Sequence, residues 1–303
     1  FSLKAPLSLA CKSRFVKRFA SRHVSNPLLR PRLVVRFDDT IYDNHQNFYF
    51  DTSGTLFLQN YNQSSLSNLV SGSGLTDVSG ANCFVLKLDY GRFNFSVTGS
   101  QHTQGSAASN VTGLYSASFA LASVNDGLYD KSKKISELIA KNGEVTFTTY
   151  WQSSDFSVAY HTGSLVMKRA DRRAGNFISR EPQIVVTNAS PDYSVHDTVR
   201  FRLFGRDLEA EEDAPRKRKY SRKSVIYDRI YYQVVDRVTE KVILKYDDKN
   251  DSTRVSTDSN GMFFDFKMQA LLPGRSYAFD FYIIERGSSY LTRDRGTVFT
   301  VRG

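Results

Sequence analysis

A short phrase near residue 50 carries the residue types of a carboxylate-based hydrolase. Phe50-Asp51-Thr52-Ser53-Gly54 approaches the Asp-Thr-Gly loop with which aspartic proteases activate water. That chemistry needs two facing carboxylates that share a proton, hence two such loops, and a glycine directly after the hydroxyl residue. Here Ser53 intervenes and the chain holds no second copy. The phrase therefore predicts a β-turn.

A second phrase has the alternating oxygens of a calcium loop. Asp248, Asn250 and Ser252 occur at every other position. An EF-hand loop also needs glycine at its sixth position and glutamate at its twelfth, whereas this chain has Thr253 and Ser259 there. We therefore expect a turn that links two strands.

The five histidines are scattered along the chain. None forms a His-x-x-x-His pair, and the two cysteines, Cys11 and Cys83, form no Cys-x-x-Cys pair. Nothing in the sequence singles out a Ser-His-Asp set. We expect no metal, no cofactor and no enzymatic activity.

Positive charge is concentrated before the first acidic residue, Asp38. The net charge is +10, and nearly all of it lies in residues 1–37. Such a run can contact phosphates of a nucleic acid or dock on an acidic protein. We favour docking on a protein, with Arg14, Lys17, Arg18 and Arg22 as candidate contact residues. A later basic run, residues 216–223, follows acidic residues 209–213 and is expected to be an exposed, charge-balanced loop.

Aromatic residues offer one further binding chemistry. Tyr150, Trp151 and Tyr160 could form a platform on which a sugar ring stacks. The competing interpretation places Trp151 in the hydrophobic core. We favour the core position for Trp151.

The composition predicts strands as the elements that position these residues. The 303 residues include 22 Phe and 17 Tyr but one Trp, and aromatic residues favour strands. The length predicts two or three domains, and two cysteines exclude a disulfide scaffold. No apolar run approaches the roughly 18 residues of a membrane helix, so no membrane partner is expected.

The C-terminal part, residues 179–303, has the pattern of an immunoglobulin-like sandwich. Tyr277 stands three residues beyond a Pro-Gly corner and opens a long strand, which is the position of a tyrosine corner, where the hydroxyl bonds upstream backbone. Seven strands are predicted, at residues 184–187, 199–204, 230–235, 242–246, 262–268, 277–285 and 297–301.

The middle part, residues 39–178, is expected to be a β-rich domain with one short helix at 131–143. Ile135, Leu138 and Ile139 share one helical face, and Asn142-Gly143 is a C-terminal stop. Clusters of Gly, Ser and Asn predict long loops at 63–81 and 99–112, and residues 170–181 read as a linker. The predicted strands are 55–59, 83–89, 92–97, 114–121, 145–151, 156–160 and 165–168.

The first part, residues 1–38, ends in a phrase similar to the closing strands of DNRLRE-type jelly-roll modules. It comprises Ala20-Ser21-Arg22-His23, Asn26-Pro27 and Arg30-Pro31-Arg32-Leu33-Val34-Val35, with His23 where those modules usually have Glu. The resemblance implies the end of a jelly roll. The whole chain is thus predicted to be an all-β protein of tandem β-sandwich domains.

Phrases in the other two parts resemble virion structural proteins of large, contractile-tailed, T4-like bacteriophages. They are residues 48–61 (FYFDTSGTLFLQNY), 98–103 (TGSQHT), 254–264 (RVSTDSNGMFF) and 272–277 (LPGRSY). The resemblance implies a non-enzymatic particle component at the neck, collar or tail. Its partners would be other virion proteins and further copies of this chain in a ring or array. A carbohydrate-binding or adhesion module is the alternative.

Overall fold

A computed structural model describes most of the chain. The described residues are 21, 23–25, 30, 36–72, 76–104, 108–170, 182–207, 224–285 and 287–303. The predicted jelly-roll strands, the linker after residue 170, the basic loop at 216–223, and Arg14, Lys17, Arg18 and Arg22 lie outside them. The chain divides into two compact units, Phe1–Arg36 and Phe37–Gly303.

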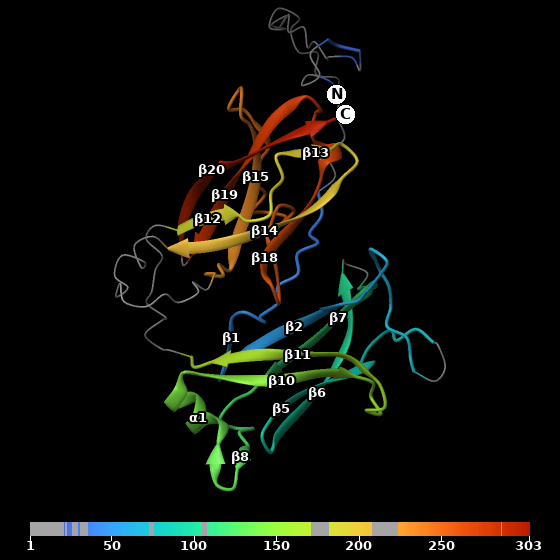
Figure 1. Ribbon diagram of the computed structural model, residues 1–303, viewed down its shortest axis with the longest axis vertical. Coiled ribbons are helices and arrows are strands. Elements are labelled where there is room, and N and C mark those ends of the chain that lie inside the picture. Colours follow the sequence, from blue (N-terminus) through green and yellow to red (C-terminus); the bar gives the residue numbers. More distant parts are fainter. Residues whose placement is uncertain are drawn as a thin grey trace, which may run out of the picture. The chain divides into compact units, whose positions relative to one another are not determined.

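The regular secondary structure of the larger unit is almost entirely strand (Figure 1). Its buried side chains form two separate hydrophobic clusters. One cluster collects buried side chains between Phe48 and Met167, and the other collects those between Ile184 and Val301. Each is enclosed by sheets, so the fold is the predicted tandem of β-sandwiches. Within the described ranges, no helix is long and apolar enough to cross a membrane.

The middle sandwich is built from seven strands that follow one another through continuous pairing. Their order is β1-β11-β10-β5-β6-β7-β2. The bounds are β1 Phe48–Tyr49, β2 Ser53–Gln59, β5 Phe84–Tyr90, β6 Phe93–Gln104, β7 Ser109–Ala120, β10 Glu144–Gln152 and β11 Ala159–Lys168. Two short ribbons complete it, β3 Tyr61–Asn62 with β4 Ser65–Leu66 and β8 Leu128–Asp130 with β9 Lys133–Lys134.

Strand β6 belongs to both layers of this sandwich. Up to Gly99 it pairs with β5, and from Ser100 onward it pairs with β7. Gly99 faces the fully buried ring of Phe84, which a Cβ at residue 99 would overlap. Glycine is thus required where the ring passes the strand.

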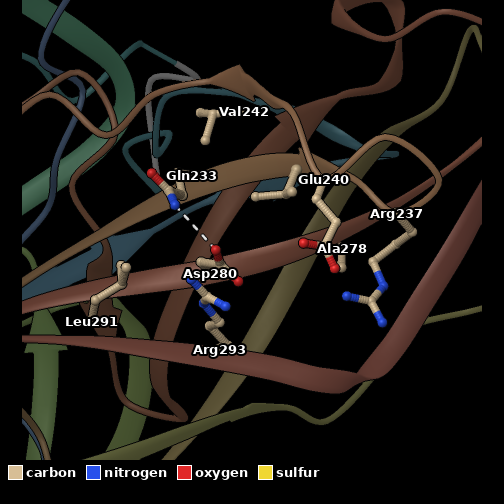
Figure 2. A pocket seen from close by; sticks show the side chains of 9 residues that line it. Gln233, Arg237, Glu240, Val242, Ala278, Asp280, Leu291 and Arg293 are labelled. Carbon is tan, nitrogen blue, oxygen red and sulfur yellow. Dashed lines mark hydrogen bonds between the residues drawn. The ribbon is translucent and has the colours of Figure 1, made fainter.

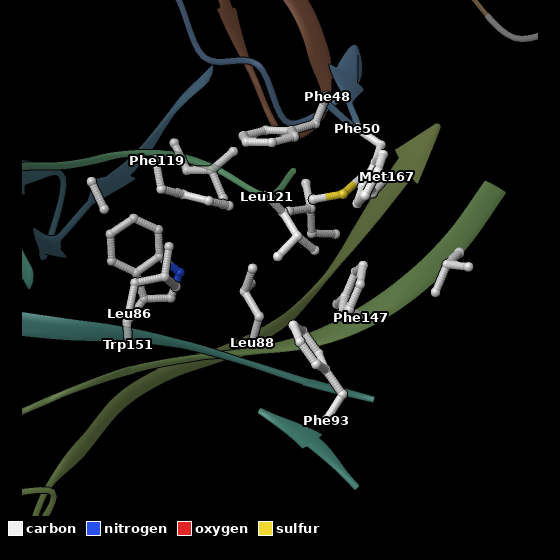
Figure 3. Packing of buried hydrophobic residues seen from close by; sticks show 14 of the residues in the cluster. Phe48, Phe50, Leu86, Leu88, Phe93, Phe119, Leu121, Phe147, Trp151 and Met167 are labelled. Atoms are coloured by element: carbon white, nitrogen blue, oxygen red, sulfur yellow. The ribbon is translucent and has the colours of Figure 1, made fainter. Parts of the chain in front are cut away.

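Trp151 lies in the core of the middle sandwich. Its side chain is 2% exposed and stacks on Phe84 with the ring centroids 5.2 Å apart. Figure 3 shows it among the leucine and phenylalanine side chains of the cluster. The core interpretation is confirmed, and a sugar-stacking platform that includes Trp151 is excluded because its face is covered.

Three sequence predictions in this domain are wrong in detail. The predicted loop at 99–112 is mostly strand, since β6 and β7 extend through polar residues to Gln104 and from Ser109. The helix α1 spans only Ile135–Asn142, because residues 128–134 form a strand ribbon and Asp126 accepts hydrogen bonds from Ser136. Its end at Gly143, with φ 83°, is as predicted. Residues 156–158 are not strand. The single strand β11 covers the remainder of the two strands predicted at 156–160 and 165–168.

The C-terminal sandwich has a four-stranded and a five-stranded sheet. The first has the order β12-β14-β18-β17 and the second β13-β20-β19-β15-β16. The bounds are β12 Pro182–Val186, β13 Asp192–Ser194, β14 Thr198–Asp207, β15 Arg229–Asp236, β16 Val242–Leu244, β17 Ser256–Asp258, β18 Gly261–Lys267, β19 Arg275–Glu285 and β20 Ser288–Arg302. A 3-10 turn, Met268–Ala270, follows β18.

This arrangement is the immunoglobulin-like sandwich that the sequence predicts. The seven predicted strands are present, and β13 and β17 are additional. The chain crosses between sheets early, since β12 pairs antiparallel with β14 while β13 pairs parallel with β20. Two sheets of this order enclosing one core define the immunoglobulin-like class.

The tyrosine corner is confirmed. The Tyr277 side chain is 1% exposed, and its hydroxyl accepts a hydrogen bond from Leu272 N at 3.0 Å and donates one to Leu272 O at 2.9 Å. The middle sandwich has a similar bond that the sequence did not predict. The Tyr115 hydroxyl accepts from Leu69 N at 2.9 Å and donates to Val78 O at 2.7 Å.

Candidate interaction surface and domain junction

The protease-like phrase is a turn. Thr52 N and Thr52 Oγ1 both donate to Tyr49 O, and Asp51 has φ 64°. The Asp51 carboxylate accepts hydrogen bonds from Ser123 N and Oγ. The β-turn prediction is confirmed, and this carboxylate serves to fix a neighbouring loop.

The calcium-like phrase is also a turn, and its buried centre is Asp247. The Asp247 carboxylate accepts from Ser252 Oγ at 2.8 Å, from Asn250 Nδ2 at 3.0 Å and from backbone amides. Asn250 and Ser252 therefore donate toward Asp247, the opposite of what a cation site needs. Within the described ranges no group of three or more His, Cys, Asp or Glu side chains could hold a metal.

The outer face of the five-stranded sheet carries a hollow lined by apolar, polar and charged side chains (Figure 2). A hollow of about 300 Å³ lies over β15, β19 and β20. Gln233 and Asp280 form its floor, with Gln233 Nε2 donating to Asp280 Oδ2 at 3.1 Å. Ala278, whose small side chain leaves the space open, lies beside them.

Strand alternation and register explain this hollow. Tyr277, Phe279, Phe281 and Ile283 of β19 point into the core, so the residues between them point outward. Asp280 pairs with Gln233 on one side and Arg293 on the other, which places three polar side chains in one row.

The rim of the hollow is apolar and charged. Val242 is 43% exposed, Leu291 48% and Val298 41%. Val242 and Leu291 lie on β16 and β20, which are separated by β19 and β15. The charged rim residues are Arg237, Glu240 and Arg293. The hollow with these rim residues and Val298 is called the outer face below.

The second cleft lies where a connecting segment, residues 41–46, meets both sandwiches. On the C-terminal side Thr257 N donates to Ile41 O at 2.8 Å. Asp43 N donates to Thr257 Oγ1 at 2.8 Å, and that hydroxyl donates to Asp43 O at 2.9 Å. The segment therefore lies along β17 as a short parallel addition, with Tyr42 bridged to Thr257.

The same segment is bonded to the middle sandwich. Asn44 N donates to Thr55 O, and Thr55 N donates to Asn44 Oδ1, both at 2.9 Å. Phe57 N donates to Asp43 Oδ2 at 3.2 Å. The His45 ring bonds Ser164 O through Nε2 at 2.6 Å.

Arg200 makes a direct link across the junction. It forms a two-point ion pair with Asp265 of β18, with both distances 2.8 Å, and lies over the Phe263 ring. It also donates to Gln59 Oε1 at 3.2 Å and to the Tyr61 hydroxyl at 3.3 Å. The resulting cleft has a volume of about 320 Å³. Its ionisable lining residues are Asp43, His45, Tyr61, His161, Arg200, Arg202 and Asp258.

Burial controls the ionisation of this cleft. It raises the pKa of Asp43 to about 7, against the lowering effect of hydrogen bonds from His45 N and Phe57 N. Burial lowers the pKa of His45 from its ordinary 6.5. Of the other histidines, only His161 lines the cleft; His102 packs edge-on against Phe57, and His23 and His196 lie elsewhere.

The sequence did not identify the junction. Its only signal was the polar run at 43–47, DNHQN, directly before the first strands, which reads as an ordinary turn. The floor of the outer face was missed as well, because Gln233 and Asp280 meet only through cross-strand register.

No family model matches the chain, and no curated protein matches it. Among solved structures, Titin-A168169 is similar with a TM-score of 0.21 and 5% identity, over 88% of this chain and 95% of that one. The N-terminal Ig1-2 module of Drosophila receptor protein tyrosine phosphatase DLAR has a TM-score of 0.19 and 6% identity, over 89% and 96%. Trypsin-activated alpha-2-macroglobulin from Escherichia coli has 0.22 and 10%, over 85% of this chain and 16% of that one. Scores this low carry no information about activity or partners.

Proposed function

We propose that this protein is a non-enzymatic structural subunit of a bacteriophage virion that holds neighbouring subunits together at the neck, collar or tail. The observation that carries the docking role is the outer face of the five-stranded sheet. Val242 and Leu291 line the hollow and are 43% and 48% exposed. Val298, which pairs with the lining residue Ala278, is 41% exposed. Exposed apolar side chains interspersed with charged ones are found at many protein interfaces.

The charges of the outer face favour a protein partner. Arg237, Glu240 and Arg293 make no ion pair with another described side chain, so they are free to pair across an interface. In an interface the charges set orientation and association rate, while the buried apolar side chains supply most of the affinity. Many such modest contacts add when subunits are arrayed at high local concentration.

The placement in a phage particle rests on the sequence resemblance at residues 48–61, 98–103, 254–264 and 272–277. Rigid sandwiches with short exposed edges suit a component that is repeated in a ring or array. Residues 1–37, with Arg14, Lys17, Arg18 and Arg22, would add an electrostatic contact to an acidic neighbour.

The alternative is a carbohydrate-binding module. Burial of Trp151 leaves the predicted platform incomplete, so the outer-face hollow is the place where this alternative would act. Its floor offers an amide and a carboxylate, which are hydrogen-bonding groups for sugar hydroxyls. A glycan array without signal for the intact chain would remove this alternative.

Two measurements test the proposal. Mass spectrometry of gradient-purified particles from the source should find peptides of this chain at a fixed stoichiometry. In reconstituted assembly, Leu291→Glu with Val242→Glu should reduce incorporation at least tenfold, since two charges would be buried at the interface. Val124→Glu is the matched control, because Val124 is fully exposed in the middle sandwich. Absence from particles, or equal incorporation of both variants, would contradict the proposal.

A further inference from the structure

The connecting segment at residues 41–46 contains a buried carboxyl group that contacts both sandwiches. Asp43 is 2% exposed. Its backbone is bonded to Thr257 of the C-terminal sandwich, and its carboxyl group accepts hydrogen bonds from His45 N at 2.7 Å and Phe57 N at 3.2 Å. Phe57 belongs to β2 of the middle sandwich, so one residue joins the two domains.

Asp43 has no counterion among the described residues. The ionisable groups that line its cleft from the neighbouring elements are His45, Tyr61, His161, Arg200, Arg202 and Asp258. Both arginines are already engaged, Arg200 with Asp265 at 2.8 Å and Arg202 with Asp258 at 2.6 Å. Asp258 itself disfavours a second negative charge at Asp43.

An ionised Asp43 therefore keeps two backbone hydrogen bonds but loses its hydration without gaining a cation. A buried carboxylate in that position is destabilised by the loss of its hydration unless water enters or a proton binds. Water enters most easily at the cleft of about 320 Å³, which borders Asp43 and contacts both sandwiches.

We propose that Asp43 is a proton-operated clasp: with a proton bound it keeps the junction closed, and when ionised it favours a hydrated junction in which the sandwiches move apart. This goes beyond the proposed structural role, because it makes the angle between the two sandwiches respond to pH.

The sign follows from proton linkage. The closed junction raises the pKa of Asp43 to about 7, whereas in an open, hydrated junction the carboxyl returns to its ordinary 3.8. The free energy that Asp43 contributes to closure is therefore fully present below pH 3.8, and it is lost as the pH rises to about 7. Within that window each pH unit changes the closed-to-open ratio by up to about tenfold.

His45 acts in the opposite direction. Burial lowers the pKa of its ring, so closure is disfavoured as pH falls below 6.5, where the open-state ring becomes charged. The pH range in which Asp43 alone controls the closure is therefore near neutrality. His45→Gln should extend that pH range toward acid, while its side-chain amide can still donate a hydrogen bond to Ser164 O.

The test is a distance measurement between the sandwiches. The two natural cysteines are first replaced, as Cys11→Ser and Cys83→Ser. New cysteines for the spin labels are then introduced at two exposed positions, as Val124→Cys and Val238→Cys. Pulsed dipolar spectroscopy should give a narrow distance distribution at pH 6 and a broader or longer one at pH 8.5. Asp43→Asn, which keeps an acceptor but cannot ionise, should give the narrow distribution at both pH values.

Two outcomes would overturn the proposal. The first is a distance distribution that does not change between pH 6 and 8.5 in the spin-labelled protein with Asp43 present. The second is a distance distribution that changes with pH as much in Asp43→Asn as it does with Asp43 present. If Asp43→Asn does not fold, the titration of the Asp43 carboxyl carbon by NMR in the natural sequence decides. Titration near pH 7 supports the clasp, and titration near pH 4 refutes it. Neither result depends on whether the chain assembles into particles.

Discussion

Removing the hydroxyl of Tyr277 isolates the contribution of the tyrosine corner. In Tyr277→Phe the ring still fills its buried site, but Leu272 N and Leu272 O each lose a hydrogen bond, of 3.0 and 2.9 Å. At about 1 kcal/mol for each neutral hydrogen bond, the loss is about 2 kcal/mol. A sandwich of roughly 120 residues unfolds with an entropy near 0.25 kcal/mol/K, so its melting temperature should fall by about 8 °C.

Differential scanning calorimetry measures this shift on the transition that contains the C-terminal sandwich. Tyr49→Phe is the control, because Tyr49 is 38% exposed in the middle sandwich. Removal of its hydroxyl group should change the melting temperature by less than about 2 °C. A shift in Tyr277→Phe as small as that of the control would refute the reasoning, since it would mean that water satisfies Leu272 equally well.

Three further changes have defined expectations. Gly99→Ala should destabilise the middle sandwich by about 1–3 kcal/mol in urea unfolding because the new methyl group overlaps the Phe84 ring, and an unchanged midpoint would contradict this. Burial alone would raise the pKa of Asp236, but hydrogen bonds from backbone amides and Arg275 outweigh it and lower that pKa. The stability cost of Asp236→Asn should therefore be full at neutral pH and shrink as pH falls below about 4, and a cost independent of pH would count against the ion pair. Calcium at millimolar concentration should leave the melting temperature unchanged, since Asp247 is already occupied by protein donors, and a rise would show a site there.

The sequence predicted those elements whose signal is local. Runs of apolar and aromatic residues indicated β10, β14 and β19, and the Pro-Gly corner indicated the role of Tyr277. Short-range turn chemistry was sufficient for residues 49–52 and 247–253 as well. In each case the residues that decide the structure are neighbours in the chain.

Elements that depend on distant partners were missed. The second half of β6 is polar and gave no alternation, and it is a strand only because β7 pairs with it. Strand β13 is three residues long and exists through its pairing with β20. No prediction for Asp43 came from the sequence, because nothing near it in the sequence indicates its partner Thr257, more than 200 positions away.

Both sandwiches share a feature that matters when the chain is pulled. In the middle sandwich β1 runs parallel to β11, and in the C-terminal sandwich β13 runs parallel to β20. Tension on the two ends of either domain therefore drags these strands past each other along their length. Several hydrogen bonds must then break together in shear, whereas an antiparallel terminal pair would open one bond at a time. We expect each sandwich to resist a stretching force applied at its two ends.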